Sequence, residues 1–135
     1  MTDPTDVAYL TREGSMFKAH DLPFSEAVRV GNTLYLSGQI GTLPGTLMLI
    51  DGGIEPETRQ TMENIRAVLE ANGASLDDVV KCTVMLAEIA EWKQANAVYR
   101  TFFTRHLPAR SAFATSGLAL GARIEIECIA QIGGG

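Results

Sequence analysis

Two charged residues in the last quarter of the chain, Arg110 and Glu125, have side chains that could act on a small carboxylate-bearing molecule. Arg110 follows Pro108 at the start of an expected strand, and a guanidinium can hold a carboxylate through two parallel hydrogen bonds. Glu125 lies in the last expected strand, where a carboxylate covered by a second subunit would be a candidate general base or water-positioning group. A surface arginine and a solvated acidic strand are the simpler alternatives for the two residues.

The segment from Arg123 to Ala130 alternates between apolar and charged residues with the period of two that is typical of a strand. Its apolar face consists of Ile124, Ile126, Cys128 and Ala130, and its other face of Arg123, Glu125 and Glu127. A solvated sheet face gives the same pattern. However, two acids side by side on one face repel each other, which favours a specific use for at least one of them.

Three further positions could contribute to a binding site. Ser37 and Gly38 end an expected strand, and a glycine there permits close approach of the backbone to a ligand. Ala112 shares the strand face of Arg110, and its small side chain leaves room beside the guanidinium. Asn96 lies beside the apolar stripe of the second expected helix. A bulge or turn at Gly38 and a helix-surface hydrogen bond at Asn96 remain equally simple interpretations.

Several other chemistries lack their residues. The chain has no G-x-S-x-G, Walker or G-x-G-x-x-G motif, so a nucleophile elbow and nucleotide binding are not indicated. Cys82 and Cys128 are 46 positions apart and remote from His20 and His106, whereas zinc sites usually combine short local spacings. We therefore expect no metal and no cofactor, and we expect both cysteines to be small buried residues with reduced thiols.

Composition limits the class of protein. With 135 residues, 46% of them hydrophobic, the chain is expected to form a single domain over residues 1–135, with residues 1–6 and 133–135 frayed. The formal net charge of −5 argues against a nucleic-acid partner. The N-terminus is acidic and polar, and no apolar run approaches the ~20 residues of a membrane span. A cytoplasmic protein that does not contact a membrane is the expectation.

Turn residues and periodicity predict two helices and seven short strands. The helices are expected from Pro56 to about Asn72 and from about Ala90 to His106, each with an apolar stripe at helical spacing. The strands are expected at residues 7–10, 27–30, 33–39, 47–50, 78–86, 111–115 and 122–132. Because helices and strands do not alternate strictly, an α+β fold with helices on one face of a sheet is favoured.

Taken in order, these segments resemble the RidA/YjgF family of small trimeric proteins, many of which are enamine/imine deaminases. The resemblance runs from about Leu22 to Ile132, and the order and spacing of its motifs are highly specific. The motifs are Leu22–Val28, Val30–Ile40, Thr58–Gln60 leading into Glu63–Ile65, Leu76–Val84, Asn96–Tyr99, Pro108–Ser111 and Ile124–Ala130.

The resemblance implies a chorismate mutase-like fold, in which a mixed six-stranded sheet carries two helices on one face. It also implies a homotrimer with a ligand cleft at each subunit interface. Arg110 matches the arginine that grips the substrate carboxylate, and Glu125 matches the carboxylate that orients the attacking water. Ser37, Gly38 and Asn96 match positions in or near the cleft.

Two cleft positions depart from the family pattern. Phe24 stands where better-studied members carry a tyrosine, and Ala112 stands where many carry a cysteine, so a hydroxyl and a thiol are missing from the pocket wall. The implied reaction is hydrolysis of a 2-imino or 2-enamino acid to a 2-keto acid and ammonia. The alternative is a non-catalytic trimer that binds small carboxylates or a protein partner in the same cleft. A ribonuclease activity fits the acidic charge poorly.

Overall fold

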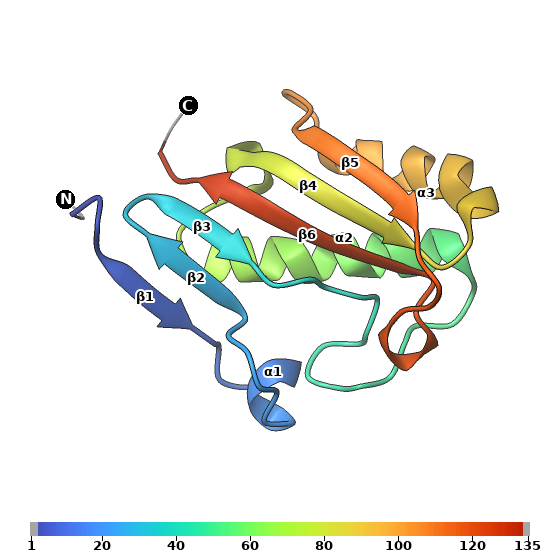
Figure 1. Cartoon of the computed structure of the whole chain (residues 1–135), viewed down its shortest axis with the longest axis horizontal. Helices are drawn as coiled ribbons and strands as arrows, with labels where there is room; N and C mark the ends of the chain where they lie inside the picture. The colour runs from blue at the N-terminus through green and yellow to red at the C-terminus, as the bar shows by residue number, and fades with distance from the viewer. Residues whose placement is uncertain (1–2, 134–135) are drawn as a thin grey trace.

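The strands pair into one mixed sheet in the order β1-β2-β3-β6-β4-β5, seen face-on in Figure 1. The computed structural model describes residues 3–133. All neighbouring strands are antiparallel except β4 and β5, which run parallel because α3 connects them. The strands are β1 (Val7–Leu10), β2 (Ala27–Val30), β3 (Thr33–Leu36), β4 (Val79–Leu86), β5 (Ala109–Ala114) and β6 (Ile124–Gln131).

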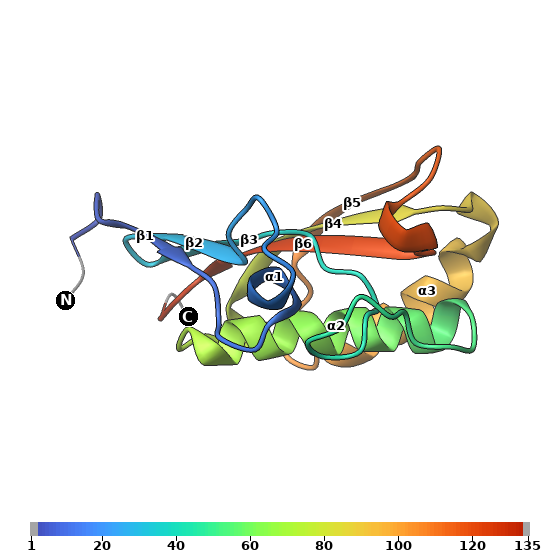
Figure 2. The same cartoon turned by 90° about the horizontal axis from the view of Figure 1, so that it is seen from below.

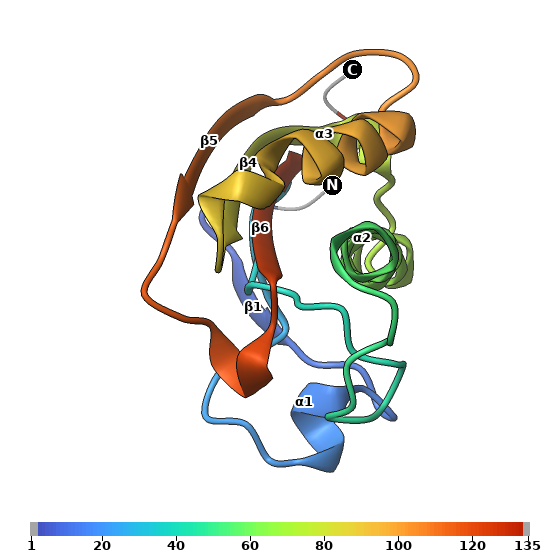
Figure 3. The ribbon, with the colours of Figure 1, turned by 90° about the vertical axis from the view of Figure 1, so that its right-hand side faces the viewer.

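The helices all lie on one side of the sheet, as the edge-on views in Figures 2 and 3 show. They are α1 (Met16–Ala19), α2 (Ile54–Ala71) and α3 (Trp92–Tyr99), and short 3-10 turns flank α3 on both sides. Along α2 the residues Met62, Ile65, Val68 and Leu69 are fully buried at helical spacing. They form the stripe that packs α2 against the sheet.

The core fills the space between these helices and the sheet. Its sheet side consists of alternate residues of the central strands, among them Cys82, Val84, Leu86, Ile124, Ile126, Cys128 and Ala130. The residues between them point to the other face of the sheet. No helix in residues 3–133 covers that face, which we call the open face (Figure 3).

The fold confirms the expected α+β class, with three local corrections. The strand expected at residues 47–50 is wrong: Leu49 makes only an isolated bridge to Thr42, within a loop. The second helix does not reach His106, because the chain is helical only as far as the 3-10 turn that ends at Phe102. The four-residue helix α1, capped by the Ser15 hydroxyl, was not expected, since one turn is too short to show a period.

The N-terminal segment from Asp3 to Asp6 forms a turn that contacts the β2–β3 hairpin. The Asp6 N–H donates to the Asp3 carbonyl at 3.0 Å, and the Gly31 N–H donates to the Asp6 carbonyl at 2.9 Å. The fraying expected at residues 1–2 and 134–135 lies outside the described residues. Among the helices of residues 3–133, none has the length and apolar character needed to cross a bilayer.

Candidate active site

Arg110 is held on the helix-facing side of β5, the edge strand. It pairs with Cys82 in the parallel β4–β5 register, and Cys82 belongs to the core, so the guanidinium points toward α3. Its Nη1 donates to Asn96 Oδ1 at 2.7 Å. The guanidinium carbon also lies 5.3 Å from the centroid of the Trp92 ring and 5.0 Å from that of Tyr99. One hydrogen bond and two ring faces therefore orient Arg110.

A small cavity of about 230 Å³ adjoins this guanidinium. It is lined by Asn96, Tyr99, Arg100, Leu107, Pro108 and Arg110. Arg110 makes no salt bridge within residues 3–133, and only one of its five N–H groups is used by Asn96. Ala112 lies two residues further along the same strand face and is half-buried. The cavity thus offers an oriented cation to a carboxylate.

Glu125 lies on the open face, in contact with the end of β3. It pairs with Met85 across β4 and β6, so it belongs to the set of residues that alternates with the core. A Cβ atom added to Gly38 would overlap Glu125 Oε2 and lie 3.0 Å from Cδ. Gly38 is therefore the residue that allows the carboxylate to rest against the backbone of the β3 end.

The environment of Glu125 favours its protonated form. Partial burial raises the pKa of this carboxyl above its usual value, and the negative charge of Glu127 on the same strand face adds to the effect. Glu125 makes no salt bridge within the described residues 3–133. A carboxylate with a raised pKa is a stronger proton acceptor than an ordinary one, which suits a general base.

Ser37 holds the segment that carries Phe24 close to Gly38 and the end of β3. The Ser37 hydroxyl donates to the Ser25 carbonyl at 2.6 Å, and the Ser37 N–H donates to the Glu26 carbonyl at 3.0 Å. Phe24 packs edge-on against Phe17 with ring centroids 5.5 Å apart, and it remains 53% exposed. The expected site residues therefore form two groups: a cationic half with Arg110, Asn96 and Ala112, and an acidic half with Glu125, Gly38, Ser37 and Phe24.

Within one chain the two halves do not meet. Arg110 pairs with Cys82 and Glu125 with Met85, so the two Cα atoms are separated by two strand spacings and three residues, about 14 Å. Because Cys82 and Met85 are an odd number of residues apart, the two side chains also lie on opposite faces of the sheet. A ligand that contacted both would have to bridge two copies of the chain.

Trp92 and Tyr99 were not predicted as site residues, because both belong to the apolar stripe of the second expected helix, which is typical of a packing face. Tyr99 is indeed buried, but its ring also supports Arg110. The spacing of Trp92, Asn96 and Tyr99, four and three residues apart, places all three on one face of α3. That spacing, read together with the nearby arginine, was the available signal.

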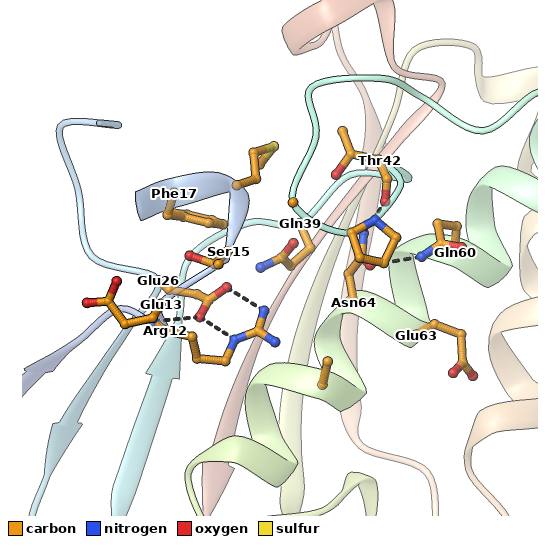
Figure 4. Close-up of a pocket in the computed structure, with 15 residues that line it drawn as sticks. Arg12, Glu13, Ser15, Phe17, Glu26, Gln39, Thr42, Gln60, Glu63 and Asn64 are labelled. Carbon is orange, nitrogen blue, oxygen red and sulfur yellow. Dashed lines mark hydrogen bonds and ion pairs between the residues drawn. The ribbon is translucent and has the colours of Figure 1, made fainter. Parts of the chain in front are cut away.

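A larger cavity lies elsewhere, between α1, the loop after β3 and α2 (Figure 4). It measures about 440 Å³ and contains neither Arg110 nor Glu125. Arg12 donates from Nε and Nη2 to the carboxylate of Glu26, at 2.8 and 2.7 Å. Glu26 is only 2% exposed. This ion pair satisfies both charges, so Arg12 and Glu26 are accounted for as part of the structure.

Comparison with known proteins finds relatives that match most of the chain in sequence and in fold. The family model described as "Endoribonuclease L-PSP" matches residues 18–132. A protein of Mus musculus named "2-iminobutanoate/2-iminopropanoate deaminase" is 41% identical over 111 residues, which is 82% of each chain. The crystal structure of RidA from the Antarctic bacterium Psychrobacter is 41% identical, with a TM-score of 0.78 over 82% of this chain and 89% of that chain. The yeast protein YEO7 is 37% identical, with a TM-score of 0.86 over 94% and 99%.

Proposed function

The chain belongs to the endoribonuclease L-PSP family, which includes the RidA proteins, and on that premise we propose that it hydrolyses 2-imino or 2-enamino acids to 2-keto acids and ammonia. The observation that carries the proposal is Arg110, oriented by Asn96 and free of any carboxylate partner among residues 3–133. A guanidinium held in this way fits the carboxylate that every such substrate carries.

The active unit that we propose is a homotrimer of the chorismate mutase-like kind, with each site completed across an interface. The division of the site supports this, because one chain presents Arg110 and Glu125 on opposite sheet faces. The open face also carries exposed aromatic side chains on three strands, namely Tyr9, Tyr35 and Phe113. Exposed aromatic side chains that gather on one face are typical of an interaction surface.

In the proposed mechanism Arg110 of one copy binds the substrate carboxylate and fixes the C=N carbon beside a water molecule. Glu125 of a neighbouring copy accepts a hydrogen bond from that water and takes its proton as the oxygen adds to the carbon. Glu125 passes this proton to the imine nitrogen, which gives a tetrahedral intermediate with one hydroxyl and one amino group. The same carboxylate then moves the hydroxyl proton to the amino nitrogen, the C–N bond breaks, and ammonia leaves as the carbonyl of the 2-keto acid forms from the added oxygen.

Phe24 and Ala112 shape the proposed substrate preference. Neither side chain can donate a hydrogen bond, and Phe24 presents an apolar ring that is half-exposed. If this ring and Ala112 both line the completed cleft, the cleft is more apolar than one with a tyrosine and a cysteine at these two positions. We therefore expect 2-imino acids with apolar side chains to be preferred over those with polar side chains.

The test generates imino acids in situ with an amino-acid oxidase, in the presence of catalase, and traps them with semicarbazide. The protein should lower semicarbazone formation. Arg110→Lys keeps the charge but loses the planar fork, and we expect it to lose about tenfold to a hundredfold in kcat/KM. Glu125→Gln should lose roughly a hundredfold in kcat. Wild-type activity in both variants, with the oligomer intact by light scattering, would refute the assignment.

Titration with a 2-keto acid separates the proposal from its main alternative. Binding that requires Arg110, without hydrolysis of any imino acid, would mean that the chain is a carboxylate-binding protein and that Glu125 has a structural role. RNA cleavage that survives Arg110→Ala would point to a contaminant rather than to this site, whereas RNA cleavage lost in that variant would support an endoribonuclease.

A further inference from the structure

The two cysteines of the chain face each other across the centre of the sheet. Cys82 on β4 pairs directly with Cys128 on β6, and the two Sγ atoms lie 2.8 Å apart. Both are free thiols, and both side chains are buried in the core. They are 46 positions apart, and the segment between them includes α3 and β5, so the contact is made by the fold and not by local sequence.

The two thiols are in different electrostatic states. The hydrogen bond between them lowers the pKa of Cys82, helped by the Tyr99 hydroxyl and by the positive charges of Arg110 and Lys81. The same hydrogen bond, together with burial, raises the pKa of Cys128. Of the two, Cys82 is therefore the thiol that loses its proton more readily, and the thiolate is the nucleophilic form of cysteine. Cys128 is placed as the second thiol that can react with the product.

Two neighbours of Cys82 line a cavity. Arg110, which pairs with Cys82 on the next strand, and Tyr99 both line the 230 Å³ cavity. The Tyr99 hydroxyl is buried without a well-formed hydrogen bond among residues 3–133. Cys82 itself is fully buried, so a peroxide that entered this cavity would reach the sulfur only when these side chains move.

We propose that Cys82 and Cys128 form an oxidation site at which a hydroperoxide converts the pair into a cross-strand disulfide. The Cys82 thiolate attacks one peroxide oxygen, the O–O bond breaks, and the departing oxygen takes a proton and leaves as water or an alcohol. The sulfenic acid on Cys82 is then attacked by the Cys128 sulfur, which forms the S–S bond and releases water. Two thiols lose two electrons in all, and the peroxide gains them.

The backbone already has a spacing that a disulfide can bridge. Directly paired residues of antiparallel strands have Cα atoms about 4.5–5.5 Å apart, within the range that disulfides span. The cross-link would close a loop across β4 and β6, so it should stabilise the fold against unfolding. This inference does not depend on the proposed deaminase activity, since neither sulfur is assigned a role in that reaction.

The experiment treats the reduced native protein with hydrogen peroxide, blocks the remaining thiols under denaturing conditions, and measures the intact mass. We expect a chain lighter by about 2 Da, no reactive thiols, a peptide pair linked through residues 82 and 128, and a higher Tm. Dithiothreitol should reverse all four changes. Cys128→Ala should instead stop at a sulfenic acid on Cys82 that dimedone traps, and Cys82→Ala should leave Cys128 unreacted under the same conditions.

Three results would overturn the proposal. The wild-type chain could retain both thiols at peroxide concentrations that oxidise free cysteine completely. It could gain oxygen atoms without any species that has lost two hydrogens. It could also form disulfides between chains instead of within one. Because these results are read on the wild-type protein, the proposal stays falsifiable even if a cysteine variant fails to fold.

Discussion

Substituting Gly38 by alanine moves the Glu125 carboxylate without changing its chemistry. The new methyl group would overlap Glu125 Oε2 and approach Cδ to 3.0 Å and Cγ to 3.2 Å. The end of the glutamate side chain is flexible, so the overlap is relieved by displacing the carboxylate rather than the backbone. We estimate a displacement of about 1 Å to restore ordinary van der Waals contact.

A displacement of this size is sufficient to disturb a water-positioning group. Misplacement of a reacting group by about 1 Å can cost roughly a hundredfold in rate, so we expect Gly38→Ala to lower kcat/KM for imine hydrolysis by about that factor. The free energy of unfolding should change by less than about 1 kcal/mol, because alanine also reduces the conformational freedom of the unfolded chain. Activity and stability should therefore separate.

A double-mutant cycle in the semicarbazide assay isolates the cause. If Gly38→Ala acts through the carboxylate position, it should cost little more when Glu125 is already glutamine, because the general base is then absent. The alternative is that the methyl group obstructs the ligand itself, in which case the loss would be the same in both backgrounds. Wild-type kcat/KM in Gly38→Ala, with a native circular dichroism spectrum, would refute the reasoning about Glu125.

Two further predictions concern charge. Glu127→Gln removes the repulsion on Glu125, so the pKa of Glu125 should fall, and the acidic limb of the kcat/KM profile should move to lower pH. A carboxyl whose pKa is raised in the folded state stabilises the native state at low pH, and this stabilisation is lost as the pH rises through the folded-state pKa. Because Glu127→Gln lowers that pKa, the free energy of unfolding of this variant should change less with pH in the acidic range. Arg12→Ala leaves the buried Glu26 carboxylate without its cation and should lower the free energy of unfolding, measured with urea, by about 3 kcal/mol. Lys18→Ala removes only an exposed pair with Glu13 at 3.8 Å and should lower it by less than ~0.5 kcal/mol. Equal losses in the two variants would contradict this reasoning.

Most of the fold could be predicted because burial imposes a period on the sequence. The stripe of α2 and the alternation of β6 are signals of this kind, and both elements lie within a few residues of the expected bounds. The segment at residues 47–50 was misjudged because apolar composition alone does not specify a strand. Met48 is 67% exposed, and the backbone around it bonds back onto its own loop.

The arrangement of the site depended on information that the sequence does not contain locally. The number of residues between Asn96 and Arg110 does not reveal that α3 packs beside β5. The hydrogen bond between the two residues forms because α3 connects the parallel strands β4 and β5. Similarly, β5 and β6 are neighbours in sequence, and a simple hairpin would have paired them. In the structure β4 lies between them, which separates Arg110 from Glu125.

That separation has a consequence for the chemistry. If Arg110 and Glu125 shared a sheet face within one chain, their opposite charges would pair, the pKa of the glutamate would fall, and the guanidinium fork would be occupied. Instead, Arg110 is oriented by a neutral amide and two aromatic rings, while burial and Glu127 raise the pKa of Glu125. Within one chain each group is thereby kept from pairing with the other, and in the proposed homotrimer a second copy of the chain would bring the two halves together. The position of β4 between β5 and β6 thus prevents Arg110 and Glu125 of one chain from forming an ion pair with each other.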